Sequence, residues 1–336
     1  MQTRRFGRTG LQVSALTFGG GWVGGVLIHQ DQSVAFSALD RAVAAGIDWI
    51  DTAASYGDGV SERVIGEWLA ARSSKGRPNL STKFRVDPAA GDFAGQIRRS
   101  VTDSFERLGL SKVEVLILHN QITDAGGGQM TNAGGRANLT PADILDPGGV
   151  ADAMDALRAE GLCDHIGLTA LGETNAVTEV VSSGRFDVAQ VYYNAINPTA
   201  DWTPPAAWNS TSFEGLLKAC ADQNVGVMGI RIFAAGHLAT TERHGREVPI
   251  TANSSHPAEE ARARAVWQVL GSAYGTPAQA ALRFGLACKS LATIEVGMAE
   301  LDHLEQALAA EQAGNLPNSV HAALEHVWRT DPAFVG

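Results

Sequence analysis

The feature that most constrains the fold of this chain is a regular alternation of short apolar runs with longer segments of helical periodicity. The runs are nearly continuous in apolar residues, as expected for strands buried on both faces of a parallel sheet. They lie at residues 14–18, 47–50, 79–83, 113–118, 165–168, 187–192, 225–230 and 291–296. The helix-like segments are residues 33–45, 61–71, 93–108, 149–160, 173–183, 213–223, 257–287 and 300–310. Eight strands alternating with helices predict an α/β fold, a single (β/α)8 TIM barrel domain over residues 1–336.

Composition and charge argue against several other classes of protein. With 45% apolar and 18% charged residues, and no strict period among 37 glycines, the chain resembles neither disordered, collagen-like nor coiled-coil proteins. The formal net charge of -10, with no cluster of Lys and Arg, argues against a nucleic-acid partner. The basic start at residues 1–10 lacks a signal peptide's apolar segment, and no apolar stretch approaches the roughly 18 residues of a membrane span. We therefore expect a cytoplasmic protein without membrane contact.

The three cysteines predict neither a disulfide framework nor a metal site. Cys163, Cys220 and Cys288 are far apart, odd in number and without C-x-x-C spacing. We expect them to be buried small apolar residues.

A glycine-rich stretch follows the first predicted strand. Residues 19–24 formally match G-x-G-x-x-G, and Asp40 lies at a plausible acidic distance for a dinucleotide-binding fingerprint. Such a fingerprint opens directly into a helix, whereas here residues 26–31 intervene and Asp40 falls inside a helical pattern. The pattern therefore favours a loop at a barrel mouth over a Rossmann fold.

Two long connections follow the fourth and sixth predicted strands, at residues 120–148 and 194–212. Loops of this length are usually functional or disordered, and in a barrel both would lie over the C-terminal face, where substrates bind. We expect Trp22, Trp202 and Trp208, which lie in loops after the first and sixth strands, to line the substrate pocket. Local packing of each loop is the alternative.

Four polar residues lie at or just after the ends of consecutive predicted strands. Asp51 and Tyr56 follow the second strand, Lys83 ends the third and His119 follows the fourth. Because these are the C-terminal ends of parallel barrel strands, we expect the side chains to converge on one mouth. A buried Lys needs a partner, which Asp51 would supply, and the ammonium would favour ionisation of Tyr56, making it usable near neutrality. Each residue alone has a structural interpretation, but together they predict a proton-relay site.

With these residues in place, the sequence resembles the aldo-keto reductase superfamily over most of its length. The resemblance rests on residues 5–14, on residues 51–66 with Asp51 and Tyr56, on Ser81–Lys83 and on Leu116–His119, in the family's order. It implies that Tyr56 is the general acid to a carbonyl oxygen, that Lys83 and Asp51 tune it, and that His119 orients the carbonyl. It also implies a nicotinamide cofactor held over the barrel mouth without a Rossmann domain.

The later family motifs are matched less completely. Thr169-Ala170 stands where the family usually has a Ser-Asn pair on the nicotinamide amide, and Gln190 matches the remaining amide contact. Ile230 and Arg231 replace the start of a Tyr-Ser-Pro-Leu motif, which makes Arg231 a candidate for the pyrophosphate. The positions that we expect to contact the cofactor are Gly20, Gly21, Trp22, Asp51, Thr169, Gln190, Ile230, Arg231, Gly297, Ala299 and Glu300.

The loop after the eighth strand favours NAD over NADP. Family members typically carry Lys or Arg there to bind the 2′-phosphate of NADP, whereas residues 297–307 hold no Lys or Arg and three carboxylates, Glu300, Asp302 and Glu305. The alternative is that these carboxylates merely stabilise the N-terminus of the following helix. A distant arginine, Arg231 or Arg246, remains able to reach a phosphate.

The resemblance implies a nicotinamide-dependent oxidoreductase that transfers hydride between NAD(H) or NADP(H) and an aldehyde, a ketone or the corresponding alcohol, with Tyr56 as general acid/base. An NAD-dependent sugar or polyol dehydrogenase is the alternative within this class. A nicotinamide-sensing regulatory subunit is the alternative of another class. The sequence leaves the substrate, the reaction direction and the oligomeric state open.

Overall fold

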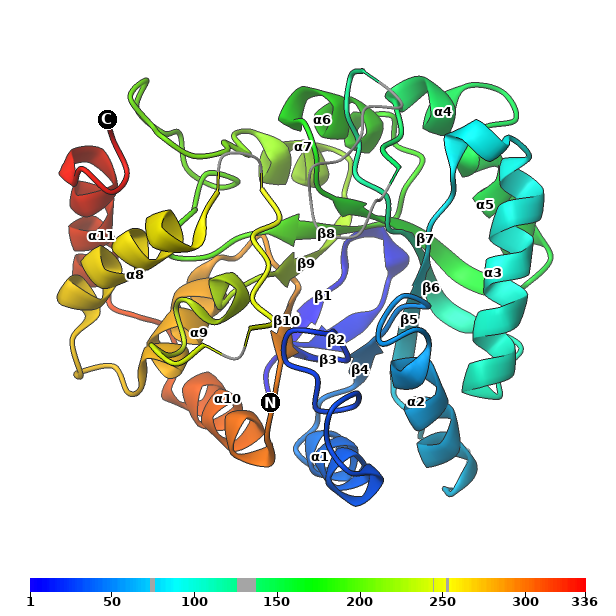
Figure 1. The fold of residues 1–336 in the computed structure, drawn as a ribbon, viewed down its shortest axis with the longest axis horizontal. Helices are drawn as coiled ribbons and strands as arrows, with labels where there is room; N and C mark the ends of the chain where they lie inside the picture. The colour runs from blue at the N-terminus through cyan, green and yellow to red at the C-terminus, as the bar shows by residue number, and fades with distance from the viewer. Residues whose placement is uncertain (73–75, 126–136, 244, 252–253) are drawn as a thin grey trace.

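In the computed structural model, which describes residues 1–72, 76–125, 137–243, 245–251 and 254–336, eight parallel strands close into a barrel surrounded by helices (Figure 1). The strands are β3 (Leu16–Gly19), β4 (Trp49–Asp51), β5 (Asn79–Phe84), β6 (Val113–Leu118), β7 (Cys163–Ala170), β8 (Val188–Tyr192), β9 (Gly226–Ile230) and β10 (Thr293–Gly297). β10 pairs with β3 and closes the ring. Every strand boundary lies within two residues of a predicted run, so the predicted (β/α)8 fold is confirmed.

The predicted helical segments form helices, with one difference. They are α1 (Gln32–Ala44), α2 (Val60–Ala70), α3 (Phe93–Leu108), α5 (Val150–Ala159), α6 (Thr174–Ser182), α7 (Leu216–Asp222), α8 (His256–Leu270), α9 (Pro277–Ala287) and α10 (Leu301–Ala313). The segment predicted at 257–287 is therefore two helices. Gly271 ends α8 with a positive φ of 54°, and Thr276 starts α9 with a capping box to Gln279.

Elements outside the eightfold repeat were not predicted. They are the hairpin β1 (Thr3–Arg5) and β2 (Gln12–Ser14), the helices α4 (Pro141–Leu145) and α11 (Asn318–Thr330), and the short 3-10 helices η1 (Gly7–Thr9), η2 (Pro88–Ala90) and η3 (Ala234–Gly236). The glycines at 126–128 and 134–135 in the long connection after β6 lie outside the described residues.

The lower end of the barrel, where the parallel strands begin, is filled by apolar side chains. Phe6, which follows β1, packs edge-on against Trp49 with ring centroids 5.3 Å apart. This inner cluster is separate from the larger core between strands and helices. Its buried members are Phe6, Val13, Trp49, Val115, Ile117, Val188, Met228 and Ala292. Because packing closes this end, chemistry is confined to the opposite mouth.

Strand alternation places polar side chains inside the upper barrel. Along β4, Ile50 belongs to the core between sheet and helices, so Trp49 and Asp51 face the barrel interior. The indole Nε1 of Trp49 donates to Ser81 Oγ on β5 at 3.0 Å, and Ser81 Oγ donates to Asp51 Oδ1 at 2.5 Å. The next inward position of β5 is Lys83, so the alternation itself brings this lysine to Asp51.

The glycine-rich loop after β3 does not open into a helix, since β3 ends at Gly19 and α1 begins only at Gln32. Instead it lies against the loop after β10. Val26 N–H donates to Met298 O at 2.9 Å, and a Cβ on Gly24 would lie 2.4 Å from Met298 N. This close backbone approach explains a glycine at position 24.

The cysteines are buried with free thiols, as predicted. In the described part of the chain, no helix has both the length and the apolar character that a bilayer crossing needs. No group of three or more potential metal ligands occurs among those residues either.

Candidate active site

Asp51, Tyr56 and Lys83 form one hydrogen-bonded cluster at the barrel mouth. Lys83 and Asp51 are buried, and the Lys83 ammonium donates to the Asp51 carboxylate. Lys83 Nζ also donates to Thr52 O at 2.9 Å and to Tyr56 Oη at 3.1 Å. The three donors of the ammonium are thereby used, which holds the lysine head group in a fixed position under the tyrosine.

His119 completes the predicted group of four. It follows β6, where its backbone N–H donates to Phe84 O at 2.9 Å. Its ring is perpendicular to that of Tyr56, with centroids 5.8 Å apart. Arg85 Nη2 lies 3.3 Å from His119 Nδ1. Because a guanidinium only donates, Nδ1 accepts, and the ring proton of neutral His119 is on Nε2.

The pKa values of Lys83 and Tyr56 are both raised, although burial and the main neighbouring charge act in opposite directions on each of them. Burial opposes the Lys83 ammonium, but Asp51, Tyr56 and Glu295 more than offset it and raise the lysine pKa. Desolvation also raises the pKa of Tyr56 to about 12, although Lys83 pulls it down. As expected, the Lys83 ammonium favours the ionised form of Tyr56, but desolvation raises the Tyr56 pKa by more than the ammonium lowers it, so Tyr56 does not ionise near neutral pH. Tyr56 holds its proton near pH 7 and is a donor.

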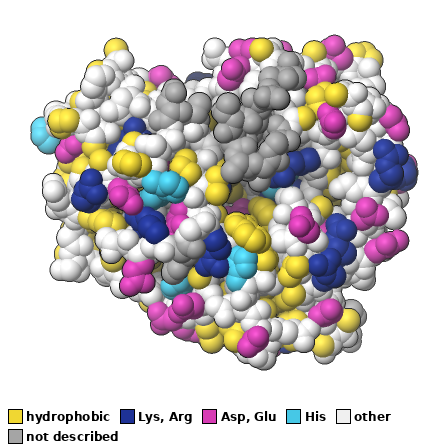
Figure 2. Space-filling model, in the orientation of Figure 1, with side chains coloured by type: hydrophobic (Ala, Val, Ile, Leu, Met, Phe, Trp, Pro, Cys, Tyr) yellow, Lys and Arg dark blue, Asp and Glu magenta, His cyan; other side chains and the backbone are white. Residues whose placement is uncertain are grey.

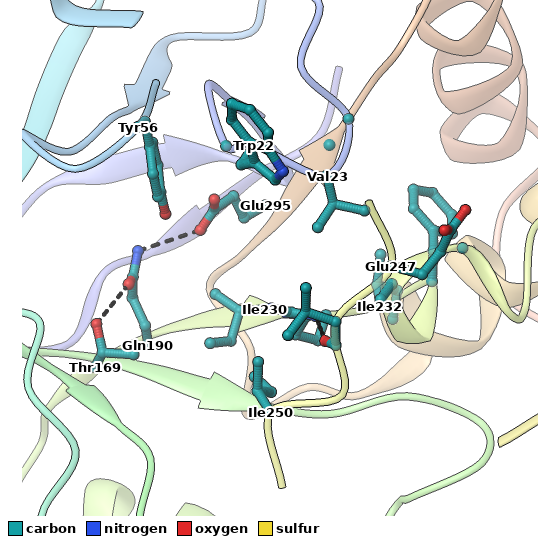
Figure 3. A pocket seen from close by; sticks show the side chains of 18 of the residues that line it. Trp22, Val23, Tyr56, Thr169, Gln190, Ile230, Ile232, Glu247, Ile250 and Glu295 are labelled. Carbon is teal, nitrogen blue, oxygen red and sulfur yellow. Dashed lines mark hydrogen bonds between the residues drawn. The ribbon is translucent and has the colours of Figure 1, made fainter. Parts of the chain in front are cut away.

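A second polar layer lies beside the cluster (Figure 3). Thr169 Oγ1 donates to Gln190 Oε1 at 3.0 Å, and Gln190 Nε2 donates to Asp51 Oδ1 at 3.0 Å and to Glu295 Oε2 at 3.2 Å. The structure thus brings the predicted Thr169 and Gln190 next to Asp51. The sequence analysis missed Glu295. A signal for it was present, because a carboxylate inside the apolar run at 291–296 is costly unless it has partners.

The carboxyl of Glu295 is partly exposed, towards the cavity. Desolvation and the neighbouring Asp51 carboxylate raise its pKa to about 8, against the opposing attraction of Lys83 and Arg231. A hydrogen bond between the two carboxyl groups acts in the same direction. Glu295 is therefore mostly neutral at pH 7.

These groups open into a cavity of 560 Å³ at the barrel mouth. Tyr56, Thr169, Gln190 and Glu295 lie at one side of it (Figure 3). The predicted residues that line it are Gly21, Trp22, Tyr56, His119, Thr169, Gln190, Ile230, Arg231, Gly297 and Ala299. Asp51 and Lys83 lie behind Tyr56. Among the residues that the structure describes, Gly20 and Glu300 do not line the cavity.

The structure explains why these two residues lie outside the lining. A Cβ on Gly20 would meet Ser61 Oγ at 2.6 Å, so this glycine faces α2 and not the cavity. Glu300 is the exposed residue that precedes α10. Their assignment as cofactor contacts is not supported by their positions.

The three tryptophans predicted in the pocket separate into two groups. Trp22 lines the cavity, is 45% exposed and packs edge-on against His29 with centroids 4.5 Å apart (Figure 3). Trp202 and Trp208 are not among the described residues that line the cavity. Their ring centroids lie 5.7 Å apart, and Trp202 packs on Trp328 of α11 at 5.4 Å.

Further contacts hold this aromatic group away from the mouth. Trp202 Nε1 donates to Glu325 Oε1 at 3.2 Å, and Trp208 stacks on Phe334 with centroids 5.6 Å apart. The pocket prediction for Trp202 and Trp208 is wrong, because residues 194–212 turn their large side chains towards the C-terminal helix. The alternative of local packing holds for both.

Arg231 follows β9 with a positive φ of 60°. Its Nη1 donates to Val248 O at 2.8 Å, which ties the loop of residues 245–251 to the cavity wall. It contributes the one Lys or Arg side chain among the described lining residues. This placement agrees with its predicted role near a phosphate, which stays a prediction.

The loop after β10 is held by local contacts. Ala299 N–H donates to His303 Nδ1 at 3.2 Å, and Gln30 Nε2 donates to Ala299 O at 3.0 Å. Of the three predicted carboxylates, Glu305 is engaged by Arg41 at 2.6 Å and 2.8 Å, and Asp302 accepts from Gln306 Nε2 at 2.7 Å. Glu305 and Asp302 are therefore held by side chains of the protein itself, and the relation of the three carboxylates to the cofactor stays a prediction.

On the face shown in Figure 2, Lys and Arg side chains are interspersed with Asp and Glu.

Comparisons with known proteins agree with this geometry. Residues 15–329 match the model of the Aldo/keto reductase family. The chain is 29% identical over 265 residues to a D-threo-aldose 1-dehydrogenase of a Pseudomonas species, covering 70% of this chain and 71% of that protein. It is 25% identical over 314 residues to an L-galactose dehydrogenase of Arabidopsis thaliana, covering 92% of this chain and 88% of that protein.

Among solved structures, an aldo-keto reductase of Bacillus halodurans in its holo form superposes with a TM-score of 0.73. The two chains are 19% identical, and the match covers 99% of each. This likeness shows a shared fold. With the family model spanning nearly the whole barrel, the chain belongs to the aldo/keto reductase family and is a nicotinamide-dependent oxidoreductase.

Proposed function

We propose that this protein catalyses reversible hydride transfer between a nicotinamide cofactor and an aldehyde or ketone, with Tyr56 as the general acid/base. The observation that carries the proposal is the geometry of Tyr56. Its Oη lies 3.1 Å from the buried Lys83 ammonium while its ring borders the cavity beside His119. A phenol fixed on a cation and open to a substrate is suited to proton transfer.

The residues at the mouth fit a nicotinamide cofactor. Thr169 and Gln190 offer a hydroxyl and an amide on the cavity wall, which match the hydrogen-bonding groups of a carboxamide. Gly21, Gly24 and Gly297 form part of the lining and leave room beside the backbone. When bound, the nicotinamide supplies or accepts the hydride.

The chain's own residues then manage the proton. In the reducing direction, Tyr56 donates its proton to the carbonyl oxygen, and Lys83 stabilises the phenolate that remains. Asp51 keeps the lysine charged and in place. His119 Nε2–H orients the same oxygen. In the oxidising direction, the Tyr56 phenolate takes the proton from the alcohol.

A sugar or polyol dehydrogenase is the second candidate function. Two relatives that match over most of their length are named as an aldose and a galactose dehydrogenase. Beside the apolar residues Trp22, Phe233 and Ile250, the cavity wall carries Gln121 and Glu247, which can bind hydroxyl groups. We therefore include aldoses and polyols among the substrates to be tested.

For the cofactor, we propose a preference for NAD over NADP. Residues 297–307 contain no Lys or Arg, and the Arg231 guanidinium is already bound to Val248 O. Arg246 is not part of the described lining. A 2′-phosphate favours a guanidinium or an ammonium, and the loop after β10 offers it neither.

The test is an absorbance assay of the purified chain in both directions. Reduced NAD and NADP are combined with a panel of aldehydes and ketones, and the oxidised forms with alcohols, aldoses and polyols. We expect turnover with at least one substrate and a higher kcat/KM with NAD(H). Cofactor binding without turnover of any substrate would instead support a nicotinamide-sensing subunit, and a tenfold preference for NADP would contradict the cofactor proposal.

A further inference from the structure

Glu295 is an acidic group at the mouth that the proton chemistry above does not use. It lies on β10 between Ile294 and Val296, which belong to the core outside the barrel, so its side chain points inward. It faces the cavity near Trp22, Tyr56 and Gln190 (Figure 3).

Charged groups from several elements surround this carboxyl. Asp51 on β4, Lys83 on β5, Tyr56 in the loop after β4 and Arg231 after β9 all interact with it electrostatically. The register neighbour on β3 is Thr17, and β8 contributes Gln190, neither of which carries a charge.

The charges inside the barrel are balanced while Glu295 is neutral. The Lys83 ammonium is matched by the Asp51 carboxylate. A second carboxylate beside Asp51 would be repelled by it, with Arg231 as the further cation that offsets part of this repulsion, and Gln190 Nε2 already divides its hydrogens between the two acids. Near pH 7, Glu295 therefore mostly keeps its proton, and a further positive charge in the cavity would favour its release.

The cofactor of the proposed function brings such a charge in only one of its two forms. The oxidised nicotinamide ring is positively charged and the reduced ring is neutral. The amide contacts that we propose, Thr169 and Gln190, lie next to Glu295, with Gln190 Nε2 at 3.2 Å from its carboxyl. A ring held there lies in the same cavity as Glu295.

We propose that Glu295 is the counter-charge for the oxidised nicotinamide: it is protonated in the free protein and with the reduced cofactor, and it releases its proton to solvent when the oxidised cofactor binds. This inference rests on the proposed function. It assigns to β10 a charge-compensating residue that discriminates between the two redox forms of the cofactor.

The proposal fixes the sign of the pH dependence of cofactor binding. With a pKa of about 8 in the free protein, Glu295 is mostly protonated at pH 6.5 and half ionised near pH 8. A nearby positive charge lowers a carboxyl pKa by about 1–3 units, so oxidised-cofactor binding favours the ionised form. The affinity for NAD+ should rise about four- to fifteenfold from pH 6.5 to 8 and level off about one pH unit higher, while that for NADH stays constant.

The test is isothermal titration calorimetry of the full chain with NAD+ and with NADH at pH 7.5. Titrations in buffers of different ionisation enthalpy give the number of protons released. We expect about 0.5–0.8 proton released with NAD+ and below about 0.2 with NADH. Glu295→Gln should still bind both forms but release none with NAD+.

A matched control is Glu247→Gln, which removes a carboxylate from the opposite side of the same cavity (Figure 3). This variant should keep the proton release. Release that persists in Glu295→Gln, that disappears in Glu247→Gln, or that is equal for both cofactor forms would overturn the inference.

Two further outcomes separate this inference from the function on which it rests. If NAD+ binds the wild-type protein without proton release and with no rise in affinity between pH 6.5 and 8, the role of Glu295 is wrong and the proposed function stands. If no nicotinamide nucleotide binds at all, the proposed function is wrong and the inference fails with it. The wild-type pH series decides the matter even where Glu295→Gln fails to fold.

Discussion

Lys83 is the residue on which the geometry of the site depends. Its ammonium is buried in the barrel and uses its three donors on Asp51, Thr52 O and Tyr56 Oη. A buried cation is stable only with such partners, and each partner is in turn positioned by it. Removing the lysine therefore affects both catalysis and stability, and the two effects need separate measurements.

We predict that Lys83→Met lowers kcat by at least about 100-fold, the scale of general acid–base catalysis, since Tyr56 loses the charge that stabilises its phenolate. The unpaired Asp51 should also destabilise the fold by about 3–5 kcal/mol. The double variant Asp51→Asn/Lys83→Met removes that charge and should recover much of the stability without activity. Steady-state kinetics measures the first effect and urea unfolding the second. A Lys83→Met enzyme whose kcat lies within tenfold of wild type would contradict the role of the lysine in proton transfer.

Trp22 and Trp202 should respond oppositely to truncation. Trp22 is 45% exposed on the cavity wall, so Trp22→Ala should alter KM and leave the free energy of unfolding within about 0.5 kcal/mol of wild type. Trp202 packs against Trp208 and Trp328, so Trp202→Ala should cost on the order of 3 kcal/mol and leave KM unchanged. Each variant is the control for the other, and the reverse pattern would refute both placements.

At single residues, sequence analysis found the functional groups where a charged side chain would be costly to bury without a partner. Lys83 stood out because an ammonium at the end of an apolar strand requires a partner, and the same reasoning applied to Glu295 would have found it. Trp202 and Trp208 were misplaced because aromatic side chains pack equally well into a pocket or under a helix. The sequence pattern does not show which of these surfaces a loop faces.

At the level of elements, the contact between α2 and α3 leaves no room at Gly66. A Cβ there would lie 2.3 Å from the backbone oxygen of Arg107. The same two helices are joined by Glu62, which is buried and accepts from Arg107 Nε at 2.7 Å and from Thr82 Oγ1 at 2.5 Å. Because close backbone contact and the partly buried Glu62–Arg107 ion pair fix the spacing, the helices cannot separate freely.

We predict that Gly66→Ala destabilises the protein by about 1–3 kcal/mol through overpacking, measured by urea unfolding. Gly21→Ala is the matched control, since its Cβ would lie at an ordinary 3.7 Å from the nearest atom of Tyr56. Equal stability of both variants would show that α2 and α3 adjust more easily than their contacts indicate.

The loop after β10 is the element that we expect to set cofactor choice. Ala299 lines the cavity, and no Lys or Arg occurs in residues 297–307. Ala299→Arg should move the ratio of kcat/KM for NADP over NAD upwards by about tenfold, because it adds a guanidinium that pairs with a 2′-phosphate. Ala299→Gln, of similar length and no charge, is the control. An unchanged ratio in the arginine variant would place the 2′-phosphate site elsewhere.

Elements were predictable from the sequence where the repeat determined them. The eight strands and their helices follow from apolar periodicity, whereas the break between α8 and α9 depends on Gly271 and the Thr276 cap, which periodicity alone does not show. The helix α11 has apolar residues at helical spacing, Val320, Leu324 and Trp328, but it lies outside the eightfold count. The hairpin β1–β2 has three-residue strands, too short to give a pattern.

Across the whole molecule, the barrel separates stability from chemistry along its axis. Phe6 and Trp49 pack in the lower end, while Asp51 and Lys83, further along β4 and β5, carry charge into the upper end. On β4 and β5 this division follows from the order of the inward-facing residues along each strand, which was implicit in the sequence. The cellular compartment, the oligomeric state and the physiological substrate depend on partners outside the chain, so pattern analysis alone does not determine them.

The most direct test of the account is the activity of Tyr56→Phe beside the wild type, with cofactor binding measured on the same samples. The substitution removes one hydroxyl and keeps the ring, which the Lys83 ammonium approaches to 4.6 Å from its centroid. We predict that kcat falls by about 10²–10⁴-fold while the Kd for NADH changes less than about twofold. A loss of less than about tenfold, with cofactor binding intact, would show that Tyr56 is not the proton donor and would contradict the mechanism.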